Sequence, residues 1–217
     1  MTNDREPTTV NREPLPRLYA ILDASCFPED QKLFAFARDL FAGGVTLLQY
    51  RNKTGSSRQM LSHARELRRL AGDGVRLIMN DRADLCLAAD FDGVHLGQDD
   101  LSPAAARRIL GNALWVGVST HNPAELAAAD QTDAAYLAIG PVFPTTSKAN
   151  PDPVIGPEGV RAARAATRKP LVAIGGITRA NARAVIDAGA DSVAVISDLL
   201  VHPRRAAEEF LAVLSCS

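Results

Sequence analysis

Short apolar runs alternate with longer segments rich in alanine, leucine and arginine from Arg17 onward. The eight runs are RLYAILD, TLLQYR, RLIMN, GVHLG, LWVGVS, AYLAIG, PLVAIG and SVAVIS. Nearly continuous apolar character is typical of strands that are covered on both faces, as in a parallel sheet. The alternation with helical segments therefore predicts repeated strand–helix units.

Several of the intervening segments carry recognisable helix boundaries. QKLFAFARDLFA has helical apolar spacing and is followed by Gly43 and Gly44, which suit a helix end. SSRQMLSHARELRRLA begins on a capping serine and stops at Gly72. ADLCLAAD has the weakest helix signal, because it is short and has few capping residues. Further helices are expected to begin at Ser102-Pro103, Asn122-Pro123, Thr178 and His202-Pro203.

Eight strand–helix units favour one α/β domain, a closed (β/α)8 TIM barrel, over an open doubly wound sheet. The open sheet stays an alternative, but no GxGxxG motif follows any predicted strand. We expect the barrel to occupy residues 17–217. Residues 1–16, MTNDREPTTVNREPLP, are polar and proline-rich and are expected to form a flexible tail.

Composition and charge exclude several classes of function. Hydrophobic residues make up 47% and charged residues 23% of the 217 residues, a balance typical of globular proteins. The formal net charge of -1 provides no general positive field for nucleic acid or an anionic membrane. Aromatic residues are 5% of the chain, which argues against a base-stacking surface. We therefore expect small-molecule substrates; the sequence does not indicate an oligomeric state.

Cysteine usage and the absence of long apolar runs bear on location. Cys26, Cys86 and Cys216 lie far apart and form no CxxC pair, which argues against a disulfide framework or a zinc site. The first residues lack the apolar stretch of a signal peptide. No apolar run approaches the roughly 20 residues that span a bilayer. We expect the protein to reside in the cytoplasm.

Polar residues at strand ends are informative, because a barrel holds its active site at the C-terminal ends of its strands. Gln49, Arg51 and Lys53 share parity at the end of the second run. If that strand continues, the three side chains lie on one face and form a cationic, hydrogen-bonding wall. The alternative is that Arg51 and Lys53 are solvated loop residues.

Acidic residues follow two neighbouring predicted strands. Asn80 and Asp81 stand at the end of the third strand, and Asp99 and Asp100 follow the fourth. Asp81 with one of Asp99 and Asp100 would suit Mg²⁺, which takes one or two carboxylates together with phosphate oxygens and water. The alternatives are turn formation at Asn80-Asp81 and capping or solvent exposure for the later pair.

The fifth strand ends in a serine followed by a histidine. Ser119 would either donate a hydrogen bond to a ligand or cap the next helix. His121 is a possible metal ligand or base, although a single histidine in a polar turn is usually incidental. His95, inside GVHLG, is expected to be a packed strand residue. No Ser/His/Asp grouping has the spacing of a catalytic triad.

The last three strand ends indicate phosphate binding. The long connection from Gly140 to Lys148 continues through ANPDPVIGPEG; it combines hydroxyls with a lysine and would form a lid. Gly175-Gly176 and Ser197 follow the seventh and eighth strands, where many barrels hold a phosphate on backbone N–H groups. With the cationic wall and the acids, these features predict two phosphorylated ligands and a transfer in which pyrophosphate leaves.

The order of these motifs resembles the thiamine-phosphate synthase family. LQYRNK is similar to the family's Q-x-R-x-K, and MNDRADL with GVHLGQDDL is similar to its N-D and V-H-L-G-Q-x-D pair. VGVSTHN, IGPVFPTTSK, AIGGI and the final VIS follow in the family's order. The resemblance extends from about Leu18 to Leu200 and implies a TIM barrel.

The resemblance implies a Mg²⁺-assisted transfer between two substrates. These are 4-amino-2-methyl-5-(diphosphooxymethyl)pyrimidine and hydroxyethylthiazole phosphate, and the products are thiamine phosphate and pyrophosphate. In this family pyrophosphate leaves first, by a dissociative route, and the thiazole nitrogen then attacks. The alternatives on the same barrel are a thiazole-phosphate tautomer isomerase, a phosphosugar epimerase and a non-catalytic phosphate-ligand sensor.

The resemblance also assigns residues. Asp81 and Asp100 match the Mg²⁺ ligands, which decides between Asp99 and Asp100. Where the family commonly has P-T-x-T-K, this chain has Ser147 before Lys148, and serine keeps the hydroxyl. The residues that match the family's binding site for the pyrimidine diphosphate are Gln49, Arg51, Lys53, Asn80, Ser119 and Lys148. Of these, the catalytic candidates are Arg51, Lys53, Ser119 and Lys148. The thiazole phosphate falls on Thr145, Thr146, Ser147, Gly176, Ile196 and Ser197.

Overall fold

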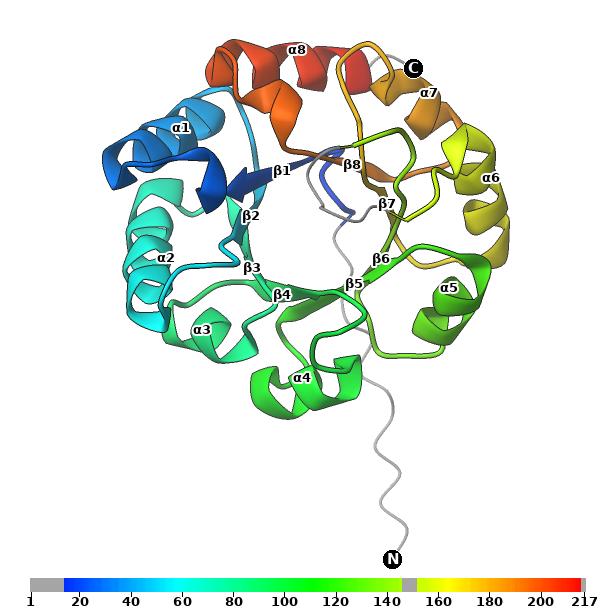
Figure 1. The fold of residues 1–217 in the computed structure, drawn as a ribbon, viewed down its shortest axis with the longest axis horizontal. Helices are drawn as coiled ribbons and strands as arrows, with labels where there is room; N and C mark the ends of the chain where they lie inside the picture. The colour runs from blue at the N-terminus through cyan, green and yellow to red at the C-terminus, as the bar shows by residue number, and fades with distance from the viewer. Residues whose placement is uncertain (1–13, 146–151, 216–217) are drawn as a thin grey trace, which may run out of the picture.

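Eight parallel strands close into a barrel in chain order in the computed structural model, which describes residues 14–145 and 152–215 (Figure 1). The strands are β1 (Leu18–Asp23), β2 (Leu47–Arg51), β3 (Arg76–Asn80), β4 (Gly93–Leu96), β5 (Trp115–Thr120), β6 (Tyr136–Ile139), β7 (Leu171–Ala173) and β8 (Ser192–Val195). Strand β1 pairs with β8, with Leu18 opposite Val193. This closing pair confirms the TIM barrel and excludes the open sheet.

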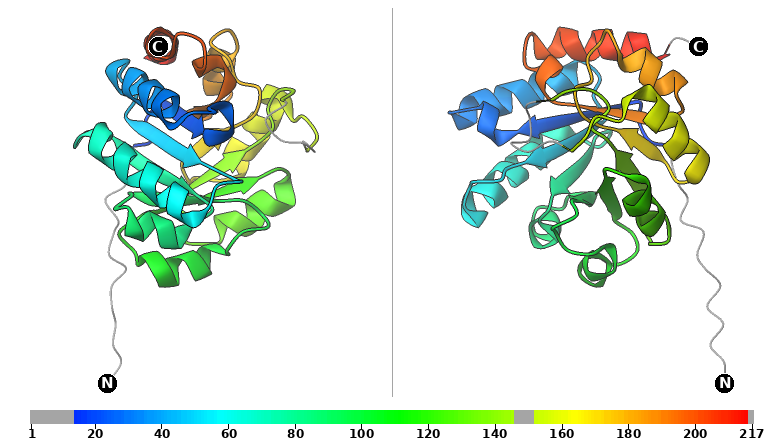
Figure 2. Two further views of the ribbon diagram at one scale, coloured as in Figure 1. Left: turned by 60° about the vertical axis from the view of Figure 1, so that its left-hand side comes forward. Right: turned by 45° about the vertical axis from the view of Figure 1, so that its right-hand side comes forward.

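Helices surround the barrel on its outside, one after each strand (Figures 1 and 2). They are α1 (Asp30–Ala42), α2 (Ser57–Ala71), α3 (Ala83–Ala88), α4 (Pro103–Leu110), α5 (Pro123–Asp130), α6 (Gly156–Ala166), α7 (Ala182–Asp187) and α8 (Pro203–Ser215). Two short 3-10 helices, η1 (Ala24–Cys26) and η2 (Ser197–Leu199), follow β1 and β8, the second after one intervening residue. The side chains of Ser56, Ser102 and Asn122 cap α2, α4 and α5, as the sequence predicts.

Two of the expected boundaries differ in the structure. Helix α7 begins at Ala182 and not at Thr178, because Asn181 Oδ1 accepts the Thr178 N–H and holds the preceding residues in a turn. Helix α6 begins at Gly156, inside the segment that was expected to continue as a loop. The connection after β6 is therefore shorter than the sequence suggested.

Alternate residues of each strand face two different apolar regions. One region lies between the strands and the helices and includes Leu48, Leu77 and Phe210. The other fills the barrel and contains Leu47, Ile78, Tyr19, Tyr136, Ala138, Val172 and Ala194, with Leu15 packed below them. The polar residues that face the mouth therefore stand above a packed interior and not above an open channel.

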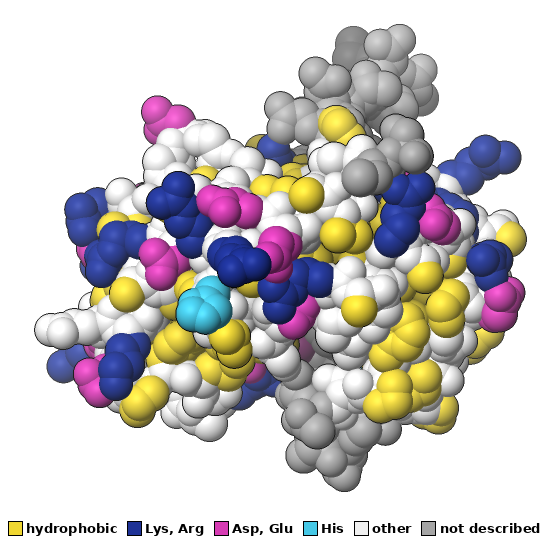
Figure 3. All heavy atoms as spheres, turned by 90° about the horizontal axis from the view of Figure 1, so that it is seen from above, with side chains coloured by type: hydrophobic (Ala, Val, Ile, Leu, Met, Phe, Trp, Pro, Cys, Tyr) yellow, Lys and Arg dark blue, Asp and Glu magenta, His cyan; other side chains and the backbone are white. Residues whose placement is uncertain are grey.

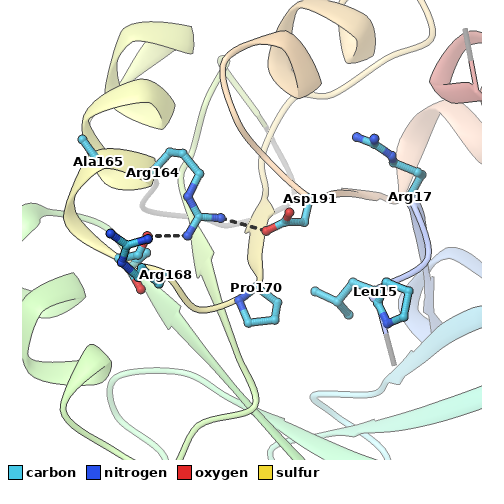
Figure 4. Close-up of a pocket in the computed structure, with 9 residues that line it drawn as sticks. Leu15, Arg17, Arg164, Ala165, Arg168, Pro170 and Asp191 are labelled. Carbon is cyan, nitrogen blue, oxygen red and sulfur yellow. Dashed lines mark hydrogen bonds and ion pairs between the residues drawn. The ribbon is translucent and has the colours of Figure 1, made fainter. Parts of the chain in front are cut away.

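At the end of the barrel away from the predicted site, Arg164 joins α6 to the residues that precede β7 and β8. Arg164 donates to Asp191 at 2.9 Å and also to the carbonyl oxygens of Thr167 and Lys169. A hollow of about 600 Å³, which Arg17 and Pro170 also line, lies at this end (Figure 4). These residues come before β1, β7 and β8, so the hollow is distant from the C-terminal strand ends.

The outer surface mixes both signs of charge. On the face that carries α8, basic and acidic side chains are interspersed (Figure 3). Arg204–Glu208 and Arg205–Glu209 are ion pairs one helical turn apart on this helix. Among residues 14–145 and 152–215, no helix is both long and apolar enough to cross a membrane.

Candidate active site

Strand β2 supplies the first wall of the barrel mouth. Gln49 is 3% exposed inside the barrel, and its Nε2 donates to Tyr19 Oη at 2.8 Å. Arg51, at the end of β2, pairs with Asp23 at the end of β1. Lys53 lies beyond the strand and donates to Asp81 at 2.5 Å, with its side chain 49% exposed. Arg51 and Lys53 are thus held at the mouth by carboxylates from neighbouring strands.

The turn that carries Lys53 is braced by the strand below it. Asn52 Oδ1 accepts the backbone N–H groups of Thr54 and Gly55, and Asn52 Nδ2 donates to Tyr50 Oη at 3.0 Å. Tyr50 Oη lies 2.8 Å from His63 Nδ1 on α2, and burial raises the pKa of this phenol to about 12. Neither Asn52 nor Tyr50 is among the residues the sequence singled out, because each looks like ordinary turn or core chemistry.

Asp81 and Asp100 come together after β3 and β4. Asp81 adopts a left-handed conformation, with φ 63°, and its N–H donates to the His95 carbonyl at 2.8 Å. Asp100 Oδ2 accepts the Gly97 N–H at 2.8 Å, whereas Asp99 is exposed. Burial raises the pKa of Asp81, and Asp100 raises it further by hydrogen bonding and charge, while Lys53 opposes both. This is a close pair of carboxyl groups with a cation beside it.

The carboxyl pair fits Mg²⁺ better than a metal that needs a full protein cage. Among the described residues, no three or more His, Cys, Asp or Glu side chains gather as metal ligands. Two carboxylates with open positions suit Mg²⁺, because this ion usually keeps several waters and takes phosphate oxygens as ligands. Repulsion between the two carboxylates, which adds to burial in raising the pKa of Asp81, would also be relieved by a divalent cation.

Asn80 has an unused donor at the same place. Its Nδ2 is buried and has no hydrogen-bond partner among the residues that the structure describes. A buried unpaired N–H is costly, and in native proteins such a group often has a water or a ligand as its partner. Asn80 stands at the end of β3, directly before Asp81. It is therefore suited to donate to a ligand oxygen that the adjacent carboxyl pair also approaches.

Ser119 and His95 meet inside the mouth. His95 Nε2 lies 2.8 Å from Ser119 Oγ, and His95 Nδ1 lies 3.0 Å from Tyr136 Oη. Helix α5 is capped by Asn122, so the capping alternative for Ser119 is wrong. Burial lowers the pKa of His95 to about 4, so its ring is neutral. His95 is buried as expected, but it makes two polar contacts that simple strand packing does not require.

His121 is separate from the carboxyl pair. Its Nδ1 lies 3.0 Å from Glu125 on α5, and its Nε2 lies 3.5 Å from Asp152. Glu125 lies within α5, and Asp152 lies in the connection between β6 and α6. The structure therefore does not place His121 with Asp81 and Asp100 as a metal ligand.

The far side of the mouth brings Gly176 against the connection after β6. Gly176 has φ 65°, and a Cβ there would lie 2.5 Å from the Pro144 carbonyl oxygen, so only glycine fits. Thr145 follows Pro144 and is half-buried. Ile196 and Ser197 lead from β8 into η2. The predicted residues Thr146, Ser147 and Lys148 lie outside the described residues.

Comparisons with known proteins agree on one family. The family model described as "Thiamine monophosphate synthase" matches residues 18–199. A relative from Koribacter versatilis (strain Ellin345), named thiamine-phosphate synthase, is 64% identical over 203 residues, which are 92% of this chain and 96% of the relative. A relative of the same name from Chloroflexus aurantiacus (strain ATCC 29366 / DSM 635 / J-10-fl) is 48% identical and covers 83% of each chain.

A solved structure gives the same result at the level of the fold. Thiamine phosphate pyrophosphorylase from Pyrococcus furiosus superposes with a TM-score of 0.81 and 36% sequence identity. The match covers 91% of this chain and 95% of that one. The likeness therefore extends over the whole barrel and not only over the motifs at its mouth.

Proposed function

The chain belongs to the thiamine monophosphate synthase family, and from that membership we propose which of its residues bind and activate the substrates. It is a transferase that forms thiamine phosphate, the activity for which its 64% and 48% identical relatives are named. The isomerase, epimerase and sensor alternatives gain no support from these relatives. Location in the cytoplasm stays a prediction from the sequence.

The proposed substrates are an aminopyrimidine that carries a diphosphooxymethyl group and hydroxyethylthiazole phosphate. The reaction breaks the bond between the pyrimidine's methylene carbon and the diphosphate oxygen, and the oxygen keeps the electron pair. The thiazole nitrogen then supplies the electron pair of the new C–N bond, which gives thiamine phosphate and free pyrophosphate. No protein nucleophile is needed, and the chain's task is to bind, orient and compensate charge.

The observation that carries this proposal is the meeting of Asp81, Asp100 and Lys53 at one edge of the mouth. We propose Asp81 and Asp100 as the ligands of Mg²⁺. When bound, the ion supplies positive charge to the diphosphate leaving group. Lys53, which pairs with Asp81 in this structure, would turn to the diphosphate as a second cation.

The remaining polar groups of the mouth would orient the pyrimidine diphosphate. Arg51, anchored by Asp23, offers its other guanidinium N–H groups to phosphate oxygens. Asn80 supplies the unpaired Nδ2 donor. Gln49 and Ser119 lie deeper in the barrel mouth and would contact the pyrimidine ring. Lys148 belongs to the same proposed set by family resemblance.

The other side of the mouth would hold the thiazole phosphate. The close approach of Gly176 to Pro144 brings the turn after β7 beside the connection that carries Thr145. Backbone N–H groups in glycine turns can approach a phosphate closely because no Cβ intervenes. We propose that this turn binds the phosphate together with residues after β6 and after β8. These residues are Thr145, Thr146, Ser147, Ile196 and Ser197.

A direct assay tests the proposed reaction. The purified protein is given both substrates with Mg²⁺, and thiamine phosphate and pyrophosphate are quantified together. Equal amounts of the two products are expected, with neither formed when one substrate is omitted. Rigorous chelation with EDTA should abolish turnover, and product formation at the full rate after chelation would overturn the metal's role.

A further inference from the structure

Five side chains form one hydrogen-bonded path across the inside of the barrel. Gln49 Nε2 donates to Tyr19 Oη at 2.8 Å, and Tyr19 Oη lies 2.9 Å from Tyr136 Oη. Tyr136 Oη lies 3.0 Å from His95 Nδ1, and His95 Nε2 lies 2.8 Å from Ser119 Oγ. The path begins on β2, passes through β1, β6 and β4, and ends on β5. Its two ends are both assigned to the pyrimidine under the proposed function.

The central rings are fixed by packing as well as by hydrogen bonds. Tyr19 and Tyr136 meet edge to face with ring centroids 5.9 Å apart, and His95 stacks on Tyr136 at 5.6 Å. A Cβ at Gly117 would lie 2.0 Å from Tyr136 Cζ, so the glycine makes room for this ring. The rings would thus keep their places if one hydroxyl were removed.

The chemistry of the first donor sets the direction of every later hydrogen bond. An amide nitrogen only donates, so Tyr19 Oη must accept the hydrogen bond from Gln49 Nε2. Tyr19 then donates its own hydroxyl hydrogen to Tyr136 Oη. Tyr136 then has its hydrogen left for His95 Nδ1. Any other arrangement leaves a buried hydroxyl hydrogen without an acceptor, which carries a desolvation penalty. Both tyrosines are almost completely buried, so water cannot offset this desolvation penalty.

His95 passes this direction on to Ser119. His95 is 8% exposed, and both of its ring nitrogens contact hydroxyl groups, so its imidazole stays neutral. A neutral imidazole has one N–H and one acceptor nitrogen. Since Nδ1 accepts from Tyr136, Nε2 carries the hydrogen and donates to Ser119 Oγ. The hydroxyl hydrogen of Ser119 is not needed within the path and remains available to a ligand. At the other end of the path, Gln49 Nε2 donates to Tyr19, so Gln49 Oε1 remains available to accept a hydrogen bond from a ligand.

We propose that Tyr19, Tyr136 and His95 are positioning residues that fix Gln49 as an acceptor and Ser119 as a donor toward the aminopyrimidine. This inference rests on the proposed function. An aminopyrimidine has the complementary pattern, because its exocyclic amine donates and its ring nitrogens accept. The path thereby couples two contacts on opposite walls, so the ring is recognised in one orientation.

Substituting one hydroxyl tests the path kinetically. Tyr136→Phe keeps the ring and removes the donor to His95. We expect the KM for the pyrimidine diphosphate to rise about tenfold, roughly the loss of one hydrogen bond, with the KM for the thiazole phosphate unchanged. Thr120→Val is the matched control, because Thr120 Oγ1 donates to the Ala138 carbonyl at 2.8 Å and is buried but lies outside the path. Equal effects of both variants on both KM values would overturn the proposal.

The tautomer of His95 gives a second, independent readout. Nitrogen-15 NMR of the ligand-free wild-type protein should show hydrogen on Nε2 and none on Nδ1. Gln49→Glu replaces the amide by a carboxylate, which can only accept, so every hydrogen bond should reverse and the His95 hydrogen should move to Nδ1. A His95 tautomer that does not respond to Gln49→Glu would refute the directed path. This result is separable from the proposed function, because it requires no turnover.

Discussion

At the scale of single residues, several polar side chains at the barrel mouth would exchange their hydrogen-bond or ion-pair partners when a ligand binds. Lys53 is paired with Asp81, and Asn80 has an unpaired donor beside them. Asp81 is held in a left-handed backbone conformation that side chains other than Asn and Asp adopt with difficulty. Its carboxyl group is therefore positioned by the backbone even though it lies close to a second carboxyl group.

The raised pKa of Asp81 predicts how metal-free stability depends on pH. The folded protein binds the Asp81 proton more tightly than the unfolded chain, so this group lowers the free energy of unfolding as pH rises through the window between the two pKa values. Asp81→Asn should remove that decline. The free energy of unfolding is measured with urea in EDTA from pH 3 to 7. The decrease in this free energy with rising pH should be smaller in the variant than in the wild type, and an equal decrease in both proteins would contradict the assignment.

At the scale of elements, the turn between β2 and α2 determines where Lys53 lies. Asn52 accepts two backbone N–H groups of that turn and donates to Tyr50. The bracing comes from the strand's own last residues and from the helix it leads into. The side chain of Lys53, which we propose to be catalytic, is thereby given a defined position just beyond the strand.

Asn52→Ala should loosen this turn and lower activity. We expect kcat/KM for the pyrimidine diphosphate to fall about tenfold, because the turn that carries Lys53 loses its support. Ser102→Ala is the control, since it removes a capping hydrogen bond from α4. That variant should lose about 1 kcal/mol of stability and keep its activity. Steady-state kinetics with urea unfolding distinguish the two effects, and full activity in Asn52→Ala would argue against the bracing role.

The positions of the helices and strands could largely be predicted from the sequence. Strand positions followed from apolar runs, and the mouth residues followed because parallel strands end on one side of a barrel. The start of α7 was missed, because Asn181 bonds back to the N–H of Thr178. Tyr19 and Tyr136 were missed for a different reason. They read as apolar strand residues, and their hydrogen bond joins positions 117 residues apart.

At the scale of the whole molecule, barrel closure brings the two proposed substrate sites together. Strands β1 and β8 pair, which sets the β8 end beside the β1 and β2 ends that carry Asp23 and Arg51. The interior below the mouth is filled by layers that include Tyr136, for which Gly117 leaves space. The same packing supports the fold and holds the polar path.

Gly117→Ala should therefore disturb the whole barrel. The added Cβ would meet the Tyr136 ring at 2.0 Å, and overpacking of this kind costs about 1–3 kcal/mol. Gly74→Ala is the matched control, because a Cβ there has no heavy atom within 4 Å. Urea unfolding should place Gly74→Ala within about 0.5 kcal/mol of the wild type. Equal stabilities of the two variants would show that the interior accommodates the extra methyl group.

The dependence of turnover on Mg²⁺ concentration tests the central assignment most directly. The wild type, Asp81→Asn, Asp100→Asn and Asp99→Asn are compared with both substrates saturating and with circular dichroism to check folding. Asp99→Asn should match the wild type, whereas Asp81→Asn and Asp100→Asn should lose about 10²-fold or more in kcat and require more Mg²⁺. Near-wild-type turnover of Asp81→Asn at limiting Mg²⁺ would contradict the account.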